Sequence, residues 1–249
     1  MIAALGMYDR AEVQGANDRL WALIRDGLRA RNLPAPDTLT RGDLAYMPGW
    51  LRPDLALSQT CGFPYRARLH GKVALIGTPD YGVQGCAPGQ YRSVFVARAH
   101  DPRALAAFNG THIAYNDALS QSGWAAPQTH AAKLGLHFPA GLQTGGHVAS
   151  ARAVAEGRTD LAALDAVTWA MIEDHDPGLA ATLRVVALTA PAPGLPCIAA
   201  LGTDTDATFA AVSDAIANLP PADRVLLHLK SLIRVPAEAY MAVPTPTSP

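Results

Sequence analysis

The stretch that decides the fold is residues 116–124, Asn-Asp-Ala-Leu-Ser-Gln-Ser-Gly-Trp. We call this stretch the serine loop. It follows a short apolar run, residues 112–115, and leads into an alanine-rich helical pattern, residues 125–134. Where a strand turns into a helix, the first N–H groups lack partners and carry the positive end of the helix dipole. Hydroxyls at Ser120 and Ser122 add donors, and Gly123 permits close approach. The loop therefore predicts an oxyanion site that needs no lysine; the alternative is an ordinary serine N-cap.

The composition excludes several classes of protein. The 249 residues are 49% hydrophobic and 16% charged, with a formal net charge of −1. This is enough chain for one large domain or two lobes, and the absence of a basic excess argues against a nucleic-acid partner. The cysteines at positions 61, 86 and 197 are too far apart in sequence for a metal motif, so no metal is expected, and no cofactor is expected either. Free thiols are expected, and a disulfide between Cys61 and Cys86 is the alternative.

Strand-like and helix-like segments alternate along the chain, which predicts an α/β fold with parallel sheets covered by helices on both faces. The predicted strands are residues 2–7, 55–58, 73–76, 92–98, 112–115, 160–164, 183–188 and 197–201. The predicted helices are residues 16–31, 102–108, 125–134, 148–156, 167–172 and 207–219.

Two segments mark places where the chain changes lobe: residues 99–102 and the Pro/Gly-rich residues 189–196. The sequence thus predicts two lobes joined by a double crossover, with a ligand cleft between them. Residues 1–99 plus 190–249 form the first lobe, and residues 100–189 form the second lobe, which carries the serine loop. The last residues, 244–249, are expected to fray.

Polar and aromatic side chains follow several of the predicted strands. In open α/β sheets, ligands bind beyond the carboxyl ends of the strands. Besides the serine loop, the residues expected there share a polar head or an aromatic ring: Tyr8, Gln59, Thr60, Tyr81, His147 and Asp165. Such groups, converging from several turns, predict a small-molecule site.

Five segments occur in an order that resembles one family: residues 59–64 (Gln-Thr-Cys-Gly-Phe-Pro), 78–81 (Thr-Pro-Asp-Tyr), 91–93 (Tyr-Arg-Ser), 120–123 (Ser-Gln-Ser-Gly) and 146–150 (Gly-His-Val-Ala-Ser). The family is the phosphate/phosphite/phosphonate-binding proteins of ABC importers, the PhnD-like branch of the type II periplasmic binding proteins. The resemblance runs from about residue 2 to residue 196 and implies a two-lobed Venus flytrap that captures an oxyanion.

The resemblance also implies a role for each residue. Ser120, Gln121, Ser122 and Gly123 hold the anion, although family members often carry a small hydroxylic residue at the position of Gln121. His147 adds a donor. Tyr8, Tyr81 and Trp50 are the aromatic residues expected to close over the ligand, and Asp165 stands where an acid can meet a ligand amino group.

Each of these residues also has a structural interpretation. His147 at a helix start could bond the backbone, since the helix dipole disfavours its protonated form there. Asp165 could cap its helix through Thr168. Gln59 and Thr60 could tie down the turn that follows them.

The function expected is non-covalent capture of a small oxyanion for an ABC-type uptake system, without catalysis. One alternative is a cytosolic ligand-sensing module of the same fold. Another is a thiol enzyme built on Cys61, which lacks a neighbouring base in sequence. The start of the chain shows no export signal, which indicates a cytoplasmic protein as written, whereas the resemblance implies the periplasm. No segment long enough to enter a membrane is expected. An ABC permease is the predicted partner besides the ligand.

Overall fold

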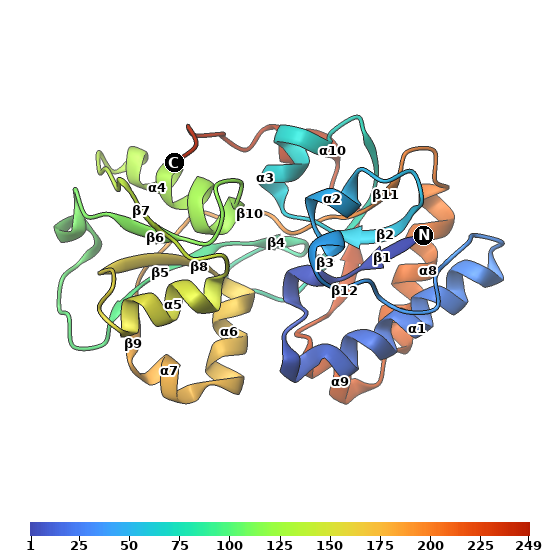
Figure 1. Cartoon of the computed structure of the whole chain (residues 1–249), viewed down its shortest axis with the longest axis horizontal. Helices are drawn as coiled ribbons and strands as arrows, with labels where there is room; N and C mark the ends of the chain where they lie inside the picture. Colours follow the sequence, from blue (N-terminus) through green and yellow to red (C-terminus); the bar gives the residue numbers. More distant parts are fainter. The chain divides into compact units, whose positions relative to one another are not determined.

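The computed structural model describes all residues, 1–249, as two units (Figure 1). Unit 1 comprises Met1–Gln90 and Pro193–Met241, and unit 2 comprises Tyr91–Ala192 and Ala242–Pro249. The first two passages between the units run through short strands that pair with each other, β4 (Gln90–Tyr91) and β10 (Ala192–Pro193).

Unit 1 contains a five-stranded sheet in the order β1-β2-β11-β3-β12. Its strands are β1 (Ile2–Ala4), β2 (Leu55–Gln59), β3 (Val73–Asp80), β11 (Cys197–Ala200) and β12 (Ser231–Ile233). Strands β1 and β2 are parallel. Strand β11 runs antiparallel to both β2 and β3, and β12 runs antiparallel to β3.

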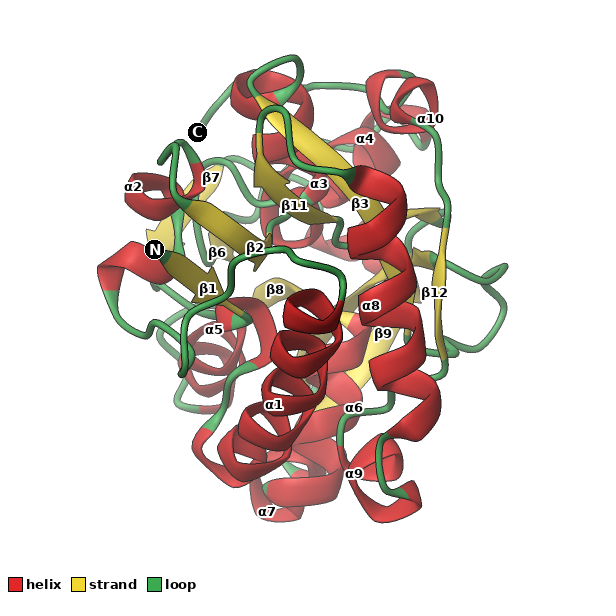
Figure 2. Cartoon of the chain, turned by 90° about the vertical axis from the view of Figure 1, so that its right-hand side faces the viewer, coloured by secondary structure: helices red, strands yellow, loops and turns green.

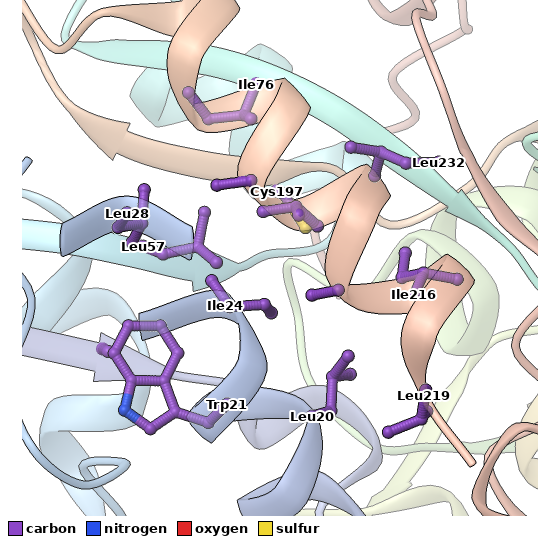
Figure 3. Packing of buried hydrophobic residues seen from close by; sticks show 14 of the residues in the cluster. Leu20, Trp21, Ile24, Leu28, Leu57, Ile76, Cys197, Ile216, Leu219 and Leu232 are labelled. Carbon is purple, nitrogen blue, oxygen red and sulfur yellow. The ribbon is translucent and has the colours of Figure 1, made fainter. Parts of the chain in front are cut away.

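Helices cover both faces of this sheet because successive strand residues point to opposite sides. On one face, the long helices α1 (Gln14–Ala30) and α8 (Thr205–Asn218) lie side by side (Figure 2). Trp21, Ile24 and Leu28 of α1 pack there with Cys197 of β11 and Ile216 of α8 (Figure 3). The neighbouring Ile198 points to the other face, into a second apolar cluster with Tyr65 and Tyr240. The remaining helices of the unit are α2 (Met47–Trp50), α3 (Gly62–Pro64), α9 (Pro221–Leu226) and α10 (Ala237–Met241).

Unit 2 repeats this plan with the order β7-β6-β8-β5-β9. Its strands are β5 (Ser93–Arg98), β6 (Ile113–Tyr115), β7 (Ala140–Gln143), β8 (Leu161–Asp165) and β9 (Leu183–Leu188). Strand β6 is parallel to β7 and β8, whereas β5 is antiparallel to β8 and β9.

Helices also pack on both faces of the second sheet. On one face, Val94 and Val96 of β5 pack with residues of α5 (His147–Ala155), α6 (Ala166–His175) and β8. The intervening Phe95 points to the opposite face, where its ring contacts Phe138 and His130. His130 belongs to α4 (Ala126–Lys133), and α7 (Pro177–Ala181) follows α6.

Most predicted elements are confirmed within a few residues, but the predicted parallel character of the sheets is wrong. Each sheet is mixed, because the strand that the chain enters directly after a passage, β5 or β11, inserts antiparallel to its neighbours. The first predicted strand is also shorter than expected, since Gly6–Tyr8 forms a 3₁₀ turn. Residues 102–108 contain only the 3₁₀ turn Leu105–Phe108. The sequence did not indicate β7, β12, α9 or α10.

The boundaries of the units differ from those expected for the lobes. Strand β5 pairs with β8 and β9, so the second unit begins at Tyr91 rather than at residue 100. The tail, residues 242–249, groups with unit 2 rather than with the first lobe. No helix combines the length and apolar composition needed to cross a lipid bilayer.

A buried tyrosine fastens α10 to the sheet of unit 1. The hydroxyl of Tyr240 lies 2.5 Å from the Thr78 hydroxyl and donates to the Gly194 carbonyl at 3.0 Å. Burial raises the pKa of Tyr240 well above its usual value, so the phenol remains a donor at all ordinary pH values.

We therefore expect Tyr240→Phe to lower the free energy of unfolding by about 1–2 kcal/mol, because buried polar partners lose their hydrogen bonds. The melting temperature should fall by about 2–8 °C, measured by circular dichroism. Tyr46→Phe is the matched control, since the Tyr46 hydroxyl also donates to a carbonyl, that of Gly6, but the residue is 44% exposed. An equal fall in both variants would contradict the assignment.

Candidate functional site

The serine loop ends in a π-helical turn, Gln121–Ala125, which continues into α4. Ser120 is its N-cap: the Ser120 hydroxyl accepts the N–H of Gly123 at 2.9 Å. The Ser120 carbonyl accepts the N–H groups of Trp124 and Ala125. Short π-turns are rare and occur frequently at functional sites. The ordinary capping role that the sequence left open for the loop is thus filled by Ser120.

Gly123 is required by the space around it. A Cβ atom at this position would lie 1.9 Å from Oδ1 of Asn116 and 3.2 Å from the Ser120 hydroxyl. Since the N–H of Gly123 is already bonded to Ser120, this residue supplies room rather than the free donor expected from the sequence. Asn116, which follows β6 directly, therefore shapes the loop, and nothing about its place in the sequence indicated this role.

Ser122 and His147 meet in unit 2, although they lie on different elements. The Ser122 hydroxyl is 2.9 Å from Nε2 of His147, and the donor depends on the imidazole tautomer. His147 is the first residue of α5, whose N-cap is Gly146 and which has no side-chain cap. The hydroxyl of Ser122 is thus bonded to the side chain of the residue that opens α5, a helix whose N-terminal N–H groups and dipole favour an anion.

The turn before α5 is held by side chains that sequence reasoning missed. The Thr144 hydroxyl donates to the carbonyls of Tyr115 and Gly146, and lies 2.7 Å from the Ser150 hydroxyl. The N–H of Gly145 bonds to the Asn116 carbonyl. These bonds fix the start of α5 to the end of β6. A threonine directly before Gly145 and Gly146 is a signal for such a turn that could have been used.

His147 is neutral at physiological pH. Burial of the ring lowers its pKa from 6.5 to about 4, and a weaker interaction with the Ala163 backbone opposes the shift. Because the folded pKa lies below the unfolded one, the stability that this group contributes is complete above pH 6.5. It is lost as the pH falls toward 4.

Asp165 ends β8 and caps α6. Its Oδ1 accepts the N–H groups of Val167 at 2.8 Å and Thr168 at 3.2 Å, and the residue is 2% exposed. This is the capping role that the sequence left open beside a ligand contact. Strand β8 packs against the π-turn, so Asp165 and the buried Gln121 belong to the same region of unit 2.

Three other predicted residues contact one another within unit 1. Nε2 of Gln59, at the end of β2, donates to the Tyr81 hydroxyl at 2.9 Å. The rings of Tyr8 and Tyr81 meet edge to face with centroids 4.9 Å apart. Tyr8 is buried, whereas Tyr81 is partly exposed. The structure therefore brings Tyr8, Gln59 and Tyr81 together, and their contact with a ligand stays a prediction.

Two further predicted positions in unit 1 are deeply buried. Thr60 is fully buried; its N–H bonds to the Pro196 carbonyl, and its hydroxyl has no partner within the chain. Trp50 lies in the second apolar cluster of unit 1, the one with Tyr65 and Tyr240, and its indole N–H donates to the Ser58 hydroxyl. Trp50 is thus a core residue with a satisfied donor. Cys61, Cys86 and Cys197 are free thiols, and Cys61 and Cys197 are buried.

The fold is similar to that of solved binding proteins. PhnD1 from Prochlorococcus marinus, in complex with methylphosphonate, superposes with a TM-score of 0.71 at 18% identity, covering 96% of this chain and 94% of that one. A binding protein component of an ABC phosphonate transporter from Pseudomonas aeruginosa gives 0.66 at 18% identity, covering 93% and 80%. XAC2383 from Xanthomonas citri, bound to chloride, gives 0.70 at 18% identity, covering 96% and 92%. At these identities the likeness shows the fold, the two-lobed type II periplasmic-binding-protein fold.

A sequence comparison with curated proteins finds no match. A family model does match, over residues 53–238, which is most of the chain. Its description is the periplasmic substrate-binding protein of phosphonate ABC transporters, a family of binding proteins and not of enzymes. The chain belongs to this family of phosphonate substrate-binding proteins of ABC transporters.

Proposed function

We propose that this protein captures a small phosphorus oxyanion, a phosphonate, phosphite or phosphate, at Ser122, His147 and the N-terminus of α5. It would pass this ligand, in the periplasm, to the permease of an ABC importer. Family membership supports the role as a binding protein. The contact between the serine loop and His147 supports the choice of these residues as the anion site.

The observation that carries the proposal is the hydrogen bond between the Ser122 hydroxyl and Nε2 of His147. If neutral His147 carries its proton on Nε2, it donates to Ser122 and leaves the serine O–H free for a ligand oxygen. His147, the partner of that hydroxyl, is the first residue of α5, whose first turn has no side-chain cap. A hydroxyl and several backbone N–H groups at one place suit an anion with more than one oxygen.

The serine loop and the start of α5 offer dipoles rather than cations to a ligand. His147 is neutral at physiological pH, and no lysine or arginine occurs in residues 112–132 or 134–151. Selectivity must then arise from the number and direction of donors, which favours a tetrahedral oxyanion over a planar carboxylate. The methylphosphonate complex of the Prochlorococcus marinus relative is consistent with this ligand class.

A panel of small anions tests the ligand class. We expect methylphosphonate, phosphite or phosphate to raise the melting temperature by several degrees, because a ligand that binds only the folded chain stabilises it. Sulfate, acetate and malate serve as comparison anions. A larger shift with a carboxylate than with every phosphorus oxyanion would contradict the proposal.

Ser122→Ala should weaken binding of the best phosphorus oxyanion by about 10- to 100-fold, because a hydrogen bond to a charged group is worth about 1.5–3 kcal/mol. Isothermal titration calorimetry measures the loss, and an unchanged circular dichroism spectrum shows that the fold persists. Ser213→Ala, on α8 of unit 1, is the matched control and should bind normally. Unaltered affinity in Ser122→Ala would remove Ser122 from the site.

His147→Gln tests the charge state of the site. Glutamine keeps an N–H donor but does not titrate, so affinity should fall by less than about ten-fold. Because the pKa of His147 is about 4, the ratio of the two affinities should stay constant between pH 5 and 8. A ratio that grows as the pH drops below 6.5 would instead mean that a protonated His147 binds the anion.

A further inference from the structure

The chain passes between the two units a third time, in addition to the two crossovers that the sequence predicts. Helix α10 (Ala237–Met241) belongs to unit 1, but the residues that follow it, Ala242–Pro249, belong to unit 2. We call residues 242–249 the C-terminal strap. The sequence analysis expected residues 244–249 to fray, and the structure groups them with unit 2.

The strap is bonded to the serine loop itself. The indole N–H of Trp124 donates to the carbonyl oxygen of Thr247 at 2.9 Å. Trp124 is only 5% exposed, and its ring packs against Tyr115 with centroids 5.3 Å apart. Trp124 lies in the same π-turn as Ser122, two residues further along the chain. The strap therefore contacts the element that positions the proposed anion donor.

The other end of the strap starts from a fixed point. Tyr240, one residue before the end of α10, is 1% exposed and bonded through its hydroxyl to Thr78 and Gly194 of unit 1. Its ring also meets Tyr65 edge to face. The strap thus begins two residues after the buried Tyr240 and is bonded to Trp124 through Thr247.

The sequence of the strap suits such a role. Residues 243–249 read Val-Pro-Thr-Pro-Thr-Ser-Pro. Each proline fixes its own φ and restricts the residue before it, so the segment loses little conformational entropy when it is held. Proline-rich segments also leave their carbonyls without internal partners, which makes them ready acceptors for an indole N–H.

We propose that the C-terminal strap is a positioning element for ligand binding: the bond from Trp124 to the Thr247 carbonyl holds the π-turn in the form that presents Ser122. A π-turn is a sparsely populated conformation and persists only where surrounding contacts determine it. Within this turn, Trp124 donates a hydrogen bond to the strap. The ligand part of this inference rests on the proposed function; the effect on the loop does not.

Two variants remove the bond by different routes. Trp124→Phe keeps an aromatic ring against Tyr115 but has no N–H, and a chain ending at Pro244 lacks the acceptor. Thr247→Ala is the matched control, because it changes the side chain and keeps the carbonyl. Hydrogen exchange of the amides in residues 120–126 is the first measurement, with α1 as the internal reference for intact folding.

We expect faster exchange in residues 120–126 for both variants, unchanged exchange in α1, and no change in Thr247→Ala. Affinity for methylphosphonate should fall by about five-fold in each, the effect of one ordinary hydrogen bond. Because the shortened chain already lacks the acceptor of this bond, adding Trp124→Phe to it should weaken binding no further than the shortening alone.

Unchanged exchange in Trp124→Phe would overturn the proposal, as would faster exchange with full affinity or an additive loss in the combined variant. If the unaltered protein binds no phosphorus oxyanion, the proposed function fails, and the exchange comparison still decides whether the strap holds the loop. If the shortened chain does not fold, Trp124→Phe against Thr247→Ala decides alone.

Discussion

The hydrogen bond between Ser122 and His147 is the interaction on which the proposed site depends. It joins the serine loop, which follows β6, to the start of α5, which follows β7. Neighbouring residues hold each of the two partners in place. Gly123 and Ser120 shape the turn that carries Ser122, while Thr144 fixes the turn before His147. Burial keeps the imidazole uncharged, so the pair can donate a hydrogen bond to an anion without carrying a positive charge.

The local elements of this fold were largely predictable, because their signals are local. Helix α1 shows apolar residues at helical spacing, and β8 is a short apolar run ended by a capping aspartate, Asp165. The loop at residues 116–124 was recognised from its serines and glycine. What could not be predicted is which of its donors remain available. Ser120 and Gly123 bond to each other, and that choice depends on the π-turn, for which the sequence carries no periodic signal.

The pairing of segments that lie far apart in the sequence was the other feature that could not be predicted. Strand β5 looks like any buried strand in sequence, and nothing in residues 93–98 indicates that it runs antiparallel between β8 and β9. Likewise, the bond between Trp124 and Thr247 joins residues that are far apart in sequence, and a Pro/Thr-rich tail is ordinarily taken as unstructured. Contacts of this kind depend on the assembled fold.

The order of strands in unit 1 has a consequence for biosynthesis. Strand β11 lies between β2 and β3, yet β3 ends at Asp80 and β11 begins at Cys197. A ribosome therefore completes β2 and β3 long before the strand that joins them exists, and both strands emerge with unpaired edges. The core of unit 2, by contrast, is encoded in one run, Tyr91–Ala192. The core of unit 2 can thus fold before the central strand of unit 1 has been synthesised. The nascent residues of unit 1 are therefore the part most in need of protection from aggregation.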